Sequence, residues 1–226
     1  NVADLRSTNV LSKAFIEAAI QAGYAQNDDF NGAQQEGVGR FQVTQKSGER
    51  CSAAKGYLTP VRSRPNLTVM TGVQVTRLLI ERDLQNTPYA TGVQFIQDGQ
   101  ERTVLAKCEV ILCAGTMFSP QLLMLSGIGD RAALHAHGID CVRHLPGVGK
   151  NLQDHLDVMV VQKSLKRVAY NLGWLNLCRA PWQAMRYLLK RDGTLTTNGA
   201  EAGAFIKSGA HQPVPDLQLI FTPCQL

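Results

Sequence analysis

A serine, a histidine and an aspartate in this sequence could together perform nucleophilic catalysis. Asp154 and His155 are adjacent in the segment LPGVGKNLQDH, and Ser126 stands in LMLSGIG. An α/β-hydrolase exposes its serine on a GxSxG turn, and this sequence contains no such turn. Ser126 instead fits the end of a helix, where Gly127 stops the helical pattern. The sequence therefore argues against a hydrolase.

The histidines and cysteines do not have the spacing of a metal site. His135 and His137 lie near the expected end of a helix, where His commonly interacts with the terminal carbonyls. The cysteines form no CxxC pair and have no His at ligand spacing, so we expect neither zinc nor a disulfide scaffold. This pattern fits a reducing compartment, and we expect a cytoplasmic protein. The six cysteines are Cys51, Cys108, Cys113, Cys141, Cys178 and Cys224.

A glycine-rich segment, GIGDRA at 127–132, has the GxGxxA spacing of a dinucleotide-binding loop. Such a loop directly follows a strand, whereas the preceding QLLMLS has a helical pattern. A strand-turn-helix unit is predicted earlier, with CEVILCAG at 108–115 as a buried parallel strand and Gly115 in the turn. Ser119 and Pro120 suit the N-cap and first position of the helix.

The N-terminus of that helix offers free N–H groups to a phosphate, a ribose or a flavin edge. The alternative is an ordinary strand-helix connection that only buries leucines. Further helices are predicted over 11–23, with Ser12 as N-cap and Gly23 as the stop, over 52–61, and over 182–191. Strands are predicted near 41–44, in two pieces of 66–81 broken near Gly72, in a hairpin over 90–106 with its turn at Asp98-Gly99, over 156–165, and over 216–221.

Composition limits the class of protein. The 226 residues are 44% hydrophobic and carry a net charge of +5, which is typical of a folded chain. The basic residues are scattered, so we expect no nucleic-acid partner. No apolar run approaches the roughly 20 residues of a membrane span. The sequence begins without Met and stops after an apolar segment, and we expect a piece of a longer protein.

The order of several motifs resembles the glucose-methanol-choline (GMC) family of FAD-dependent oxidoreductases. GTMFSPQLLMLSGIG resembles the second signature of that family. GVGRFQVTQKSGERCSAAKGYL, followed by RPNLTVMTGVQVTRLL, is similar to its segment leading into the adenine-side strand, and LPGVGKNLQDH resembles the loop after the signature. The likeness covers essentially the whole chain, most closely from Gly37 to His155, and is strongest to bacterial choline and alcohol dehydrogenases.

The resemblance implies an α/β fold, with part of a Rossmann-like FAD-binding domain and an added antiparallel substrate-domain sheet (α+β). Residues 1–47 would be a helix and a loop leading into a substrate-domain strand. Residues 48–150 would belong to the FAD-binding domain, and residues 151–226 to the substrate-binding domain.

The resemblance also assigns candidate cofactor residues. The backbone of Val75 would meet the adenine, and Cys113, Ala114 and Gly115 would pass close to the adenosine part of FAD, with Ser119 beside them at the helix start. Backbone groups suit adenine because it presents a donor and an acceptor edge.

Glu201, in TTNGAEAGAFI, lies in a region that lines the substrate side in the family. A carboxylate there would receive a cationic or hydroxyl-bearing substrate, while a surface role is the alternative. The family's catalytic His and its GxGxxG loop have no counterpart in this chain, so we expect no catalytic residue, no activity and weak FAD binding from it alone.

The whole enzyme would oxidise a primary alcohol, such as choline, to an aldehyde by hydride transfer to FAD. The rival interpretation is a non-catalytic binding or interaction module that retains the fold. The sequence leaves open which alcohol is used, whether the enzyme is a dehydrogenase or an oxidase, whether it forms oligomers, and whether it associates with a membrane.

Overall fold

The chain folds into two compact units. The computed structural model of the protein describes residues 1–164, 168–170 and 174–224. Unit 1 combines residues 1–67 and 160–226, and unit 2 comprises residues 68–159. These units do not test the expected division into cofactor and substrate domains, which stays a prediction.

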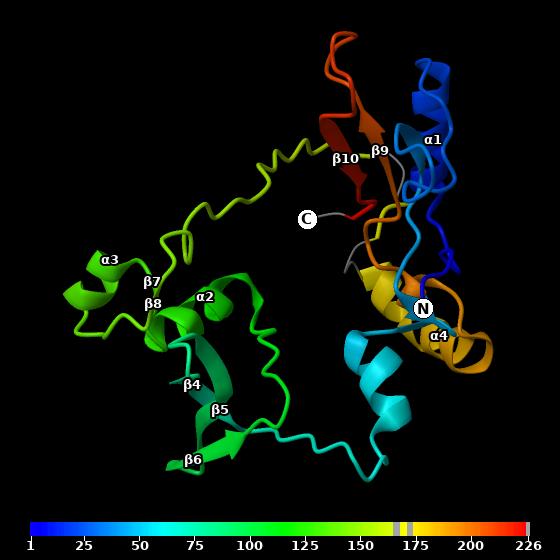
Figure 1. The fold of residues 1–226 in the computed structure, drawn as a ribbon. Coiled ribbons are helices and arrows are strands. Elements are labelled where there is room, and N and C mark those ends of the chain that lie inside the picture. Colours follow the sequence, from blue (N-terminus) through cyan, green and yellow to red (C-terminus); the bar gives the residue numbers. More distant parts are fainter. Residues whose placement is uncertain (165–167, 171–173, 225–226) are drawn as a thin grey trace. The chain divides into compact units, whose positions relative to one another are not determined.

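Unit 1 is built on an antiparallel sheet whose strands are far apart in the sequence. The strand order is β1-β9-β10, and β9 pairs with both neighbours, for example through Ala204 opposite Val38 and Leu219. The elements of unit 1 are α1 (Val10–Gln21), β1 (Gly37–Arg40), β2 (Gln45–Lys46), β3 (Glu49–Arg50), the π-helical turn η1 (Ala54–Leu58), the 3₁₀ turn η2 (Thr59–Val61), α4 (Trp174–Lys190), the 3₁₀ turn η3 (Thr194–Thr196), β9 (Ala202–Ile206) and β10 (Leu217–Phe221) (Figure 1).

Helix α1 covers one face of this sheet. Phe15, Ile16 and Ala19 recur at helical spacing and pack on the buried core residues Val38 and Ala204, together with Ile206. Ala18 and Ala22, which helical spacing alone would also place on this face, are exposed. The buried face of α1 instead includes Ser12.

Asn9, not Ser12, is the N-cap of α1. The side-chain oxygen of Asn9 accepts a hydrogen bond from the backbone N–H of Leu11 at 2.9 Å. Ser12 is fully buried, and its hydroxyl donates a hydrogen bond to the carboxylate of Glu201, so this hydroxyl is unavailable for capping. The predicted stop at Gly23 agrees with the structure, because the helix ends at Gln21 and Gly23 has a φ of 96°.

Unit 2 contains a three-stranded antiparallel meander. It consists of β4 (Gln74–Arg82), β5 (Pro88–Gln97) and β6 (Gln100–Leu105) in the order β4-β5-β6. The predicted hairpin turn is confirmed: Asp98 and Gly99 both have positive φ, 53° and 73°, as a two-residue type I′ turn requires. Of the two strand pieces predicted within 66–81, only the second forms.

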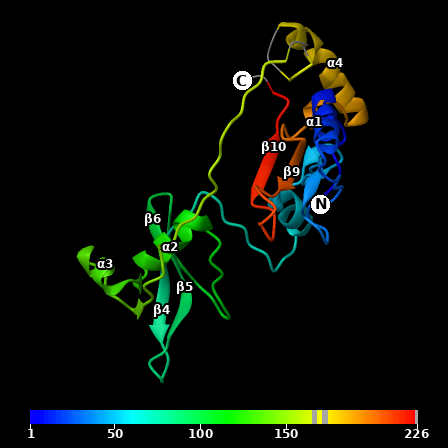
Figure 2. The same ribbon diagram turned by 90° about the horizontal axis from the view of Figure 1, so that it is seen from above.

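Two short helices and a two-stranded parallel pair complete unit 2. Helix α2 (Gly115–Leu125) lies beside β4 in both ribbon views (Figures 1 and 2). It is followed by β7 (Ile128–Gly129), α3 (Arg131–Ala136) and β8 (Arg143–His144). GIG therefore follows a helix rather than a strand, as the sequence pattern indicated, and Asp130 caps α3 by accepting from the Ala133 N–H.

The predicted start of α2 was wrong. The helix begins at Gly115, and its N-cap is Ala114, so Ser119 and Pro120 lie inside it. Gly115 has a φ of 83°, which lets the chain turn directly into the helix five residues earlier than the Ser-Pro pair suggested. Pro120 then removes one backbone hydrogen bond, the one to the Thr116 carbonyl.

Several predicted strands do not form. Residues 107–114 and 151–164 have no regular structure. The short strand predicted near 41–44 does not form either, and β1 ends immediately before it, at Arg40. Leu165, the last residue of the strand predicted over 156–165, lies outside the described residues. A parallel strand exists only beside a hydrogen-bonded neighbour, and among the described residues none lies beside 107–114. The predicted helix at 182–191 is confirmed within the longer α4, and the strand at 216–221 as β10.

Candidate functional site

The candidate cofactor residues all belong to unit 2. Val75 is the second residue of β4, half-buried and paired with Phe95 of β5. A break in the strand register lies immediately after it, between Val75 and Arg77. Its carbonyl accepts a weak hydrogen bond from the Gln74 side chain at 3.3 Å. An irregular edge strand of this kind has backbone groups with room for a further partner.

Cys113 and Ala114 lead into α2, which begins at Gly115. Cys113 and Gly115 are exposed, and Ala114 is half-buried. A side chain at Gly115 would meet no atom within 4 Å, so the space beside this glycine is open. Ala114 caps the helix without a side-chain hydrogen bond, which leaves the first N–H groups of α2 available.

Ser119 lies on the second turn of α2 and is half-buried. The sequence predicted Ser119 as the N-cap of α2, but Ser119 lies inside the helix. The helix, rather than the turn that precedes it, therefore sets the distance of Ser119 from a bound group. The structure thus places four candidate residues around the turn into α2, and Val75 on the strand against which α2 packs.

Ser126 joins α2 to β4, a connection that sequence reasoning missed. Its buried hydroxyl donates to the Leu122 carbonyl at 2.6 Å and accepts from the Leu78 backbone N–H at 2.8 Å. The hydroxyl is therefore fully engaged, which argues further against a catalytic nucleophile. Among the described residues His155 makes only a backbone contact, with the neighbouring Asp154 carboxylate at 2.8 Å.

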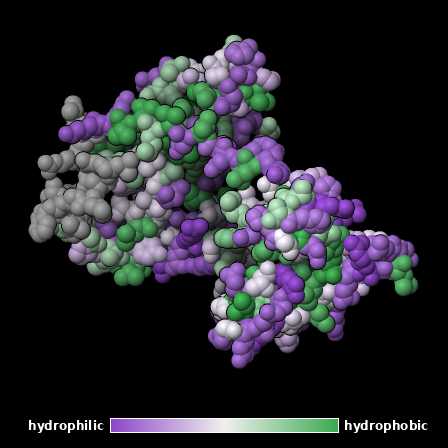
Figure 3. All heavy atoms as spheres, turned by 90° about the vertical axis from the view of Figure 1, so that its left-hand side faces the viewer, coloured by the Kyte–Doolittle hydropathy of each residue, from purple (hydrophilic) through white to green (hydrophobic). Residues whose placement is uncertain are grey.

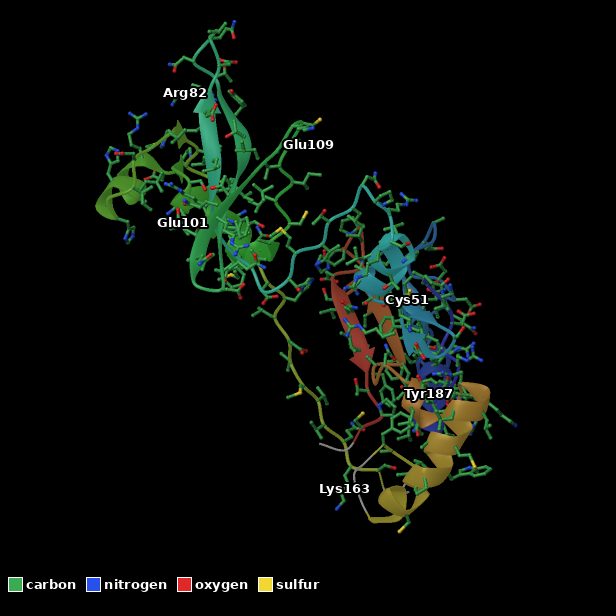
Figure 4. All side chains as sticks on the ribbon, turned by 90° about the horizontal axis from the view of Figure 1, so that it is seen from below. Cys51, Arg82, Glu101, Glu109, Lys163 and Tyr187 are labelled. Atoms are coloured by element: carbon green, nitrogen blue, oxygen red, sulfur yellow. The ribbon has the colours of Figure 1, made fainter. Side chains whose placement is uncertain are left out.

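The glycines of the signature are required by close approach. A Cβ on Gly127, whose φ is 81°, would lie 2.5 Å from the Asp140 carbonyl oxygen. A Cβ on Gly129 or on Gly149 would lie 3.2 Å from the side chain of Met124. The signature and the loop LPGVGKN therefore form one packed unit around Met124. Arg82, the last residue of β4, links this strand to the packed unit by donating a hydrogen bond to the Val142 carbonyl at 2.7 Å. Arg82 is labelled in Figure 4.

Glu201 lies in unit 1 and is completely buried. One carboxylate oxygen accepts from the Asn9 backbone N–H at 2.6 Å and from the Ser12 hydroxyl at 2.8 Å. The other accepts from the hydroxyls of Tyr170 at 2.7 Å and Thr197 at 2.8 Å. The expected alternative of a surface Glu was wrong, because Glu201, the residue immediately before β9, is buried and bonded to these four donors.

The four donors fill the acceptor sites of the Glu201 carboxylate. The carboxylate also lies at the N-terminus of α1, where the helix dipole favours negative charge. Burial, together with the hydrogen bond to Glu201, raises the pKa of Tyr170 well above its usual range. The arrangement thus favours a structural role for Glu201 over direct contact with a substrate.

Other titratable groups of the described chain have local partners. The backbone N–H of Ala133 lowers the pKa of Asp130, and the Arg186 side chain lowers the pKa of Asp192. No group of three metal-binding side chains comes together in the residues that the structure describes. Within the same residues, no helix has the length and apolar character needed to cross a membrane.

Comparison with known proteins gives the family. The sequence profile of the GMC oxidoreductases matches residues 1–157. The chain is 44% identical over 227 aligned residues to an alcohol dehydrogenase [acceptor] of Pseudomonas putida, covering 100% of the chain and 40% of that protein. It is 40% identical to an oxygen-dependent choline dehydrogenase of Staphylococcus haemolyticus, covering 96% of the chain and 37% of that protein. The chain therefore spans about 40% of the length of these relatives.

Solved structures confirm the expected α/β fold. Pyridoxine 4-oxidase from Mesorbium loti matches 90% of the chain and 35% of its own with a TM-score of 0.68 at 28% identity. An FAD-dependent oxidoreductase from Chaetomium thermophilum matches 91% of the chain and 36% of its own with a TM-score of 0.74 at 24% identity. The profile match over residues 1–157, which is more than half of the chain, shows that the chain belongs to the GMC oxidoreductase family.

Proposed function

We propose that this chain is the central part of an FAD-dependent alcohol dehydrogenase that oxidises a primary alcohol, choline or a related compound, to its aldehyde. The observation that carries the proposal is the 44% identity to an alcohol dehydrogenase along the entire chain. The 40% identity to a choline dehydrogenase supports the same class of small-molecule substrate.

FAD, when bound, would accept the hydride that leaves the alcohol carbon. The residues of this chain would hold the adenosine side of the cofactor. The backbone of Val75, beside a break in the register of β4, and the backbone of Cys113, Ala114 and Gly115 at the start of α2 fit this role, because adenine is recognised by matched donor and acceptor groups. Gly115 leaves open space, and the uncapped start of α2, with Ser119 one turn further on, favours a polar or negative group.

Glu201 would support the substrate side indirectly. Its four hydrogen bonds fix the start of α1, the segment at Tyr170 and the segment at Thr197 around one buried carboxylate. We propose that it positions the strand β9 and its surroundings rather than contacting the alcohol.

The chain alone would be catalytically inert and would bind FAD weakly. Its sequence contains no GxGxxG segment to hold the pyrophosphate. The segment GIGDRA, which has GxGxxA spacing, connects α2 to β7 and α3. We therefore assign no catalytic residue within it. All six cysteines are free thiols, which supports a cytoplasmic location.

A pair of glycine variants in the full-length enzyme tests the cofactor assignment. Gly115 and Gly138 both have positive φ, 83° and 69°, and an added Cβ meets no atom within 4 Å at either site. Gly115→Ala and Gly138→Ala should therefore cost a similar backbone strain of about 1 kcal/mol. We expect only Gly115→Ala to lower the FAD content of the purified enzyme, measured by flavin absorbance after gel filtration.

Equal FAD content in the two variants would remove Gly115 from the cofactor site. A full-length enzyme that binds no flavin at all would favour the rival, a non-catalytic module with the GMC fold. The two results can be told apart. The first concerns only the role of Gly115 in the cofactor site, and the second concerns whether the full-length protein uses FAD at all.

A further inference from the structure

The pairing of β4 with β5 is interrupted immediately beside Val75. Val75 lies opposite Phe95, and the next pair along the two strands is Arg77 with Gln94. Thr76 is therefore an extra residue of β4 that has no partner on β5. An extra residue of this kind makes a β-bulge, which bends the strand and increases its twist locally. The bulge at Thr76 consequently sets the direction of the backbone at Val75.

The side chain of Thr76 ties the two strands together at this interruption. Its hydroxyl donates a hydrogen bond to the backbone carbonyl of Gln94 at 3.2 Å, and Thr76 is half-buried. The Gln94 side chain is held in turn, because it accepts from the Arg77 guanidinium at 2.6 Å and donates to the carboxylate of Glu101, labelled in Figure 4. The Thr76 hydroxyl thus fixes the bulge to a residue that is itself bonded across the sheet β4-β5-β6.

A second bulge in the same strand pair has the same construction but lies further along β4, away from Val75. Its extra residue is Thr91 of β5, which stands between the partners of Leu79 and Ile80. The Thr91 hydroxyl donates to the Leu79 carbonyl at 3.4 Å. Because each strand contains one extra residue, the two shifts cancel, and the bulge at Thr76 returns Val75 to the register that the strands have at their connecting turn.

We propose that Thr76 is a positioning residue for the adenosine part of FAD and acts through the backbone of Val75. This inference rests on the proposed function, in which that backbone meets the adenine. Recognition of adenine by backbone N–H and C=O groups requires both groups to keep a fixed direction, since hydrogen bonds weaken steeply when they are misaligned. The Thr76 hydroxyl keeps that direction by holding the bulge at one position, whereas without it the strand can slip toward regular pairing.

Titration with FAD of the full-length enzyme, after removal of its flavin, tests this role. Thr76→Val removes the hydroxyl and keeps the branched shape that suits a strand, and the matched control Thr91→Val makes the same change at the second bulge. We expect Thr76→Val to weaken FAD binding about fivefold, which is the effect of losing one ordinary hydrogen bond. Thr91→Val should bind FAD like the wild type. Thr76→Ser keeps the hydroxyl and should restore binding to within about twofold of the wild type.

Thermal melting of the same variants separates positioning from a general loss of stability. The two valine variants should lose similar stability, because each gives up one hydrogen bond between the same two strands. Equal FAD affinity of the two valine variants, or binding by Thr76→Ser as weak as that by Thr76→Val, would overturn the role of Thr76 and leave the FAD-dependent function in place. A wild-type enzyme that binds no FAD would instead overturn the proposed function, and this inference with it.

Discussion

Glu201 shows how one buried charge can be kept in a fold without a cation beside it. Its exposure is 0%, and it makes no ion pair within the described residues. The backbone N–H of Asn9 and three hydroxyls replace the water that the carboxylate loses on burial, and the start of α1 adds a favourable dipole. The residue therefore fixes the start of α1 and the segment at Tyr170 against its own segment, which includes Thr197.

We predict that Glu201→Gln lowers the free energy of unfolding by about 2–3 kcal/mol, because the amide group turns donors toward the donors that already surround it. Urea unfolding of the wild type, of this variant and of a control variant measures the loss of unfolding free energy. Glu36→Gln is the matched control, since Glu36 pairs with Lys207 at 3.1 Å on the surface and should cost at most about 1 kcal/mol. Equal losses in the two variants would contradict the structural role of Glu201.

Tyr170 should make stability depend on pH. Its folded pKa is raised above the unfolded value by burial and by the hydrogen bond to Glu201. The folded state therefore keeps a proton that the unfolded chain releases, so the stabilisation is fully present below about pH 10 and is lost as the pH rises further. Thermal melting from neutral to alkaline pH should show a steeper loss for the wild type than for Tyr170→Phe.

Tyr57→Phe provides the control, because Tyr57 is 80% exposed. This variant should retain the wild-type pH profile. If Tyr170→Phe also retains it, the hydrogen bond to Glu201 does not couple folding to the protonation of Tyr170.

The role of Glu201 was only partly predictable from the sequence. Glu201 stands among small apolar residues in GAEAGAF, but a lone Glu is usually exposed, so its burial was not predicted. Its donors could not be predicted, since they come from positions 9, 12, 170 and 197 and meet only when the sheet β1-β9-β10 has formed. In the same way, the buried site of Ser12 displaced it from the N-cap that the local sequence favoured.

At the scale of elements, the hydroxyl of Ser126 links the helix α2 to the strand β4, which also pack against each other. Ser126 accepts from the Leu78 N–H while donating to the last turn of its own helix. This connection aligns the strand that carries Val75 with the helix that begins at Gly115. The position of both candidate cofactor segments therefore depends on Ser126.

Removing that hydroxyl should destabilise unit 2. In Ser126→Ala the buried Leu78 N–H loses its acceptor, at a cost of about 1–3 kcal/mol. We expect faster hydrogen exchange at the Leu78 amide and a lower FAD content in the full-length enzyme. Ser208→Ala, at an exposed position in unit 1, should change neither quantity. Unchanged exchange at Leu78 in Ser126→Ala would show that the bond does not hold the strand.

Elements with local determinants were predicted correctly. The hairpin turn at Asp98-Gly99 depends on two residues that tolerate positive φ, and α1 depends on apolar residues at helical spacing. Elements that need distant neighbours were not. The segment CEVILCAG has the composition of a buried parallel strand, but in this chain no described strand lies beside it, so residues 107–114 have no regular structure. The start of α2 was missed because Gly115 begins the helix before Ser119.

At the scale of the whole molecule, much apolar surface is exposed. Figure 3 shows apolar residues mixed with polar ones across one face, and exposed large apolar residues include Ile111, Met117 and Phe118 beside the candidate cofactor segment. Exposed apolar groups of this number are unusual for a folded protein and mark surfaces that other parts cover. This agrees with a chain that spans about 40% of the length of its relatives.

Alcohol-dependent bleaching of the flavin tests the central claim most directly. The full-length enzyme and the 226-residue chain are each mixed with FAD, passed through gel filtration and titrated without oxygen with choline and with simple primary alcohols. We predict that the full-length enzyme retains a visible flavin band that one of these alcohols bleaches, and that the chain alone retains little flavin. Full-length enzyme with no flavin, or with flavin that no primary alcohol reduces, would contradict the account.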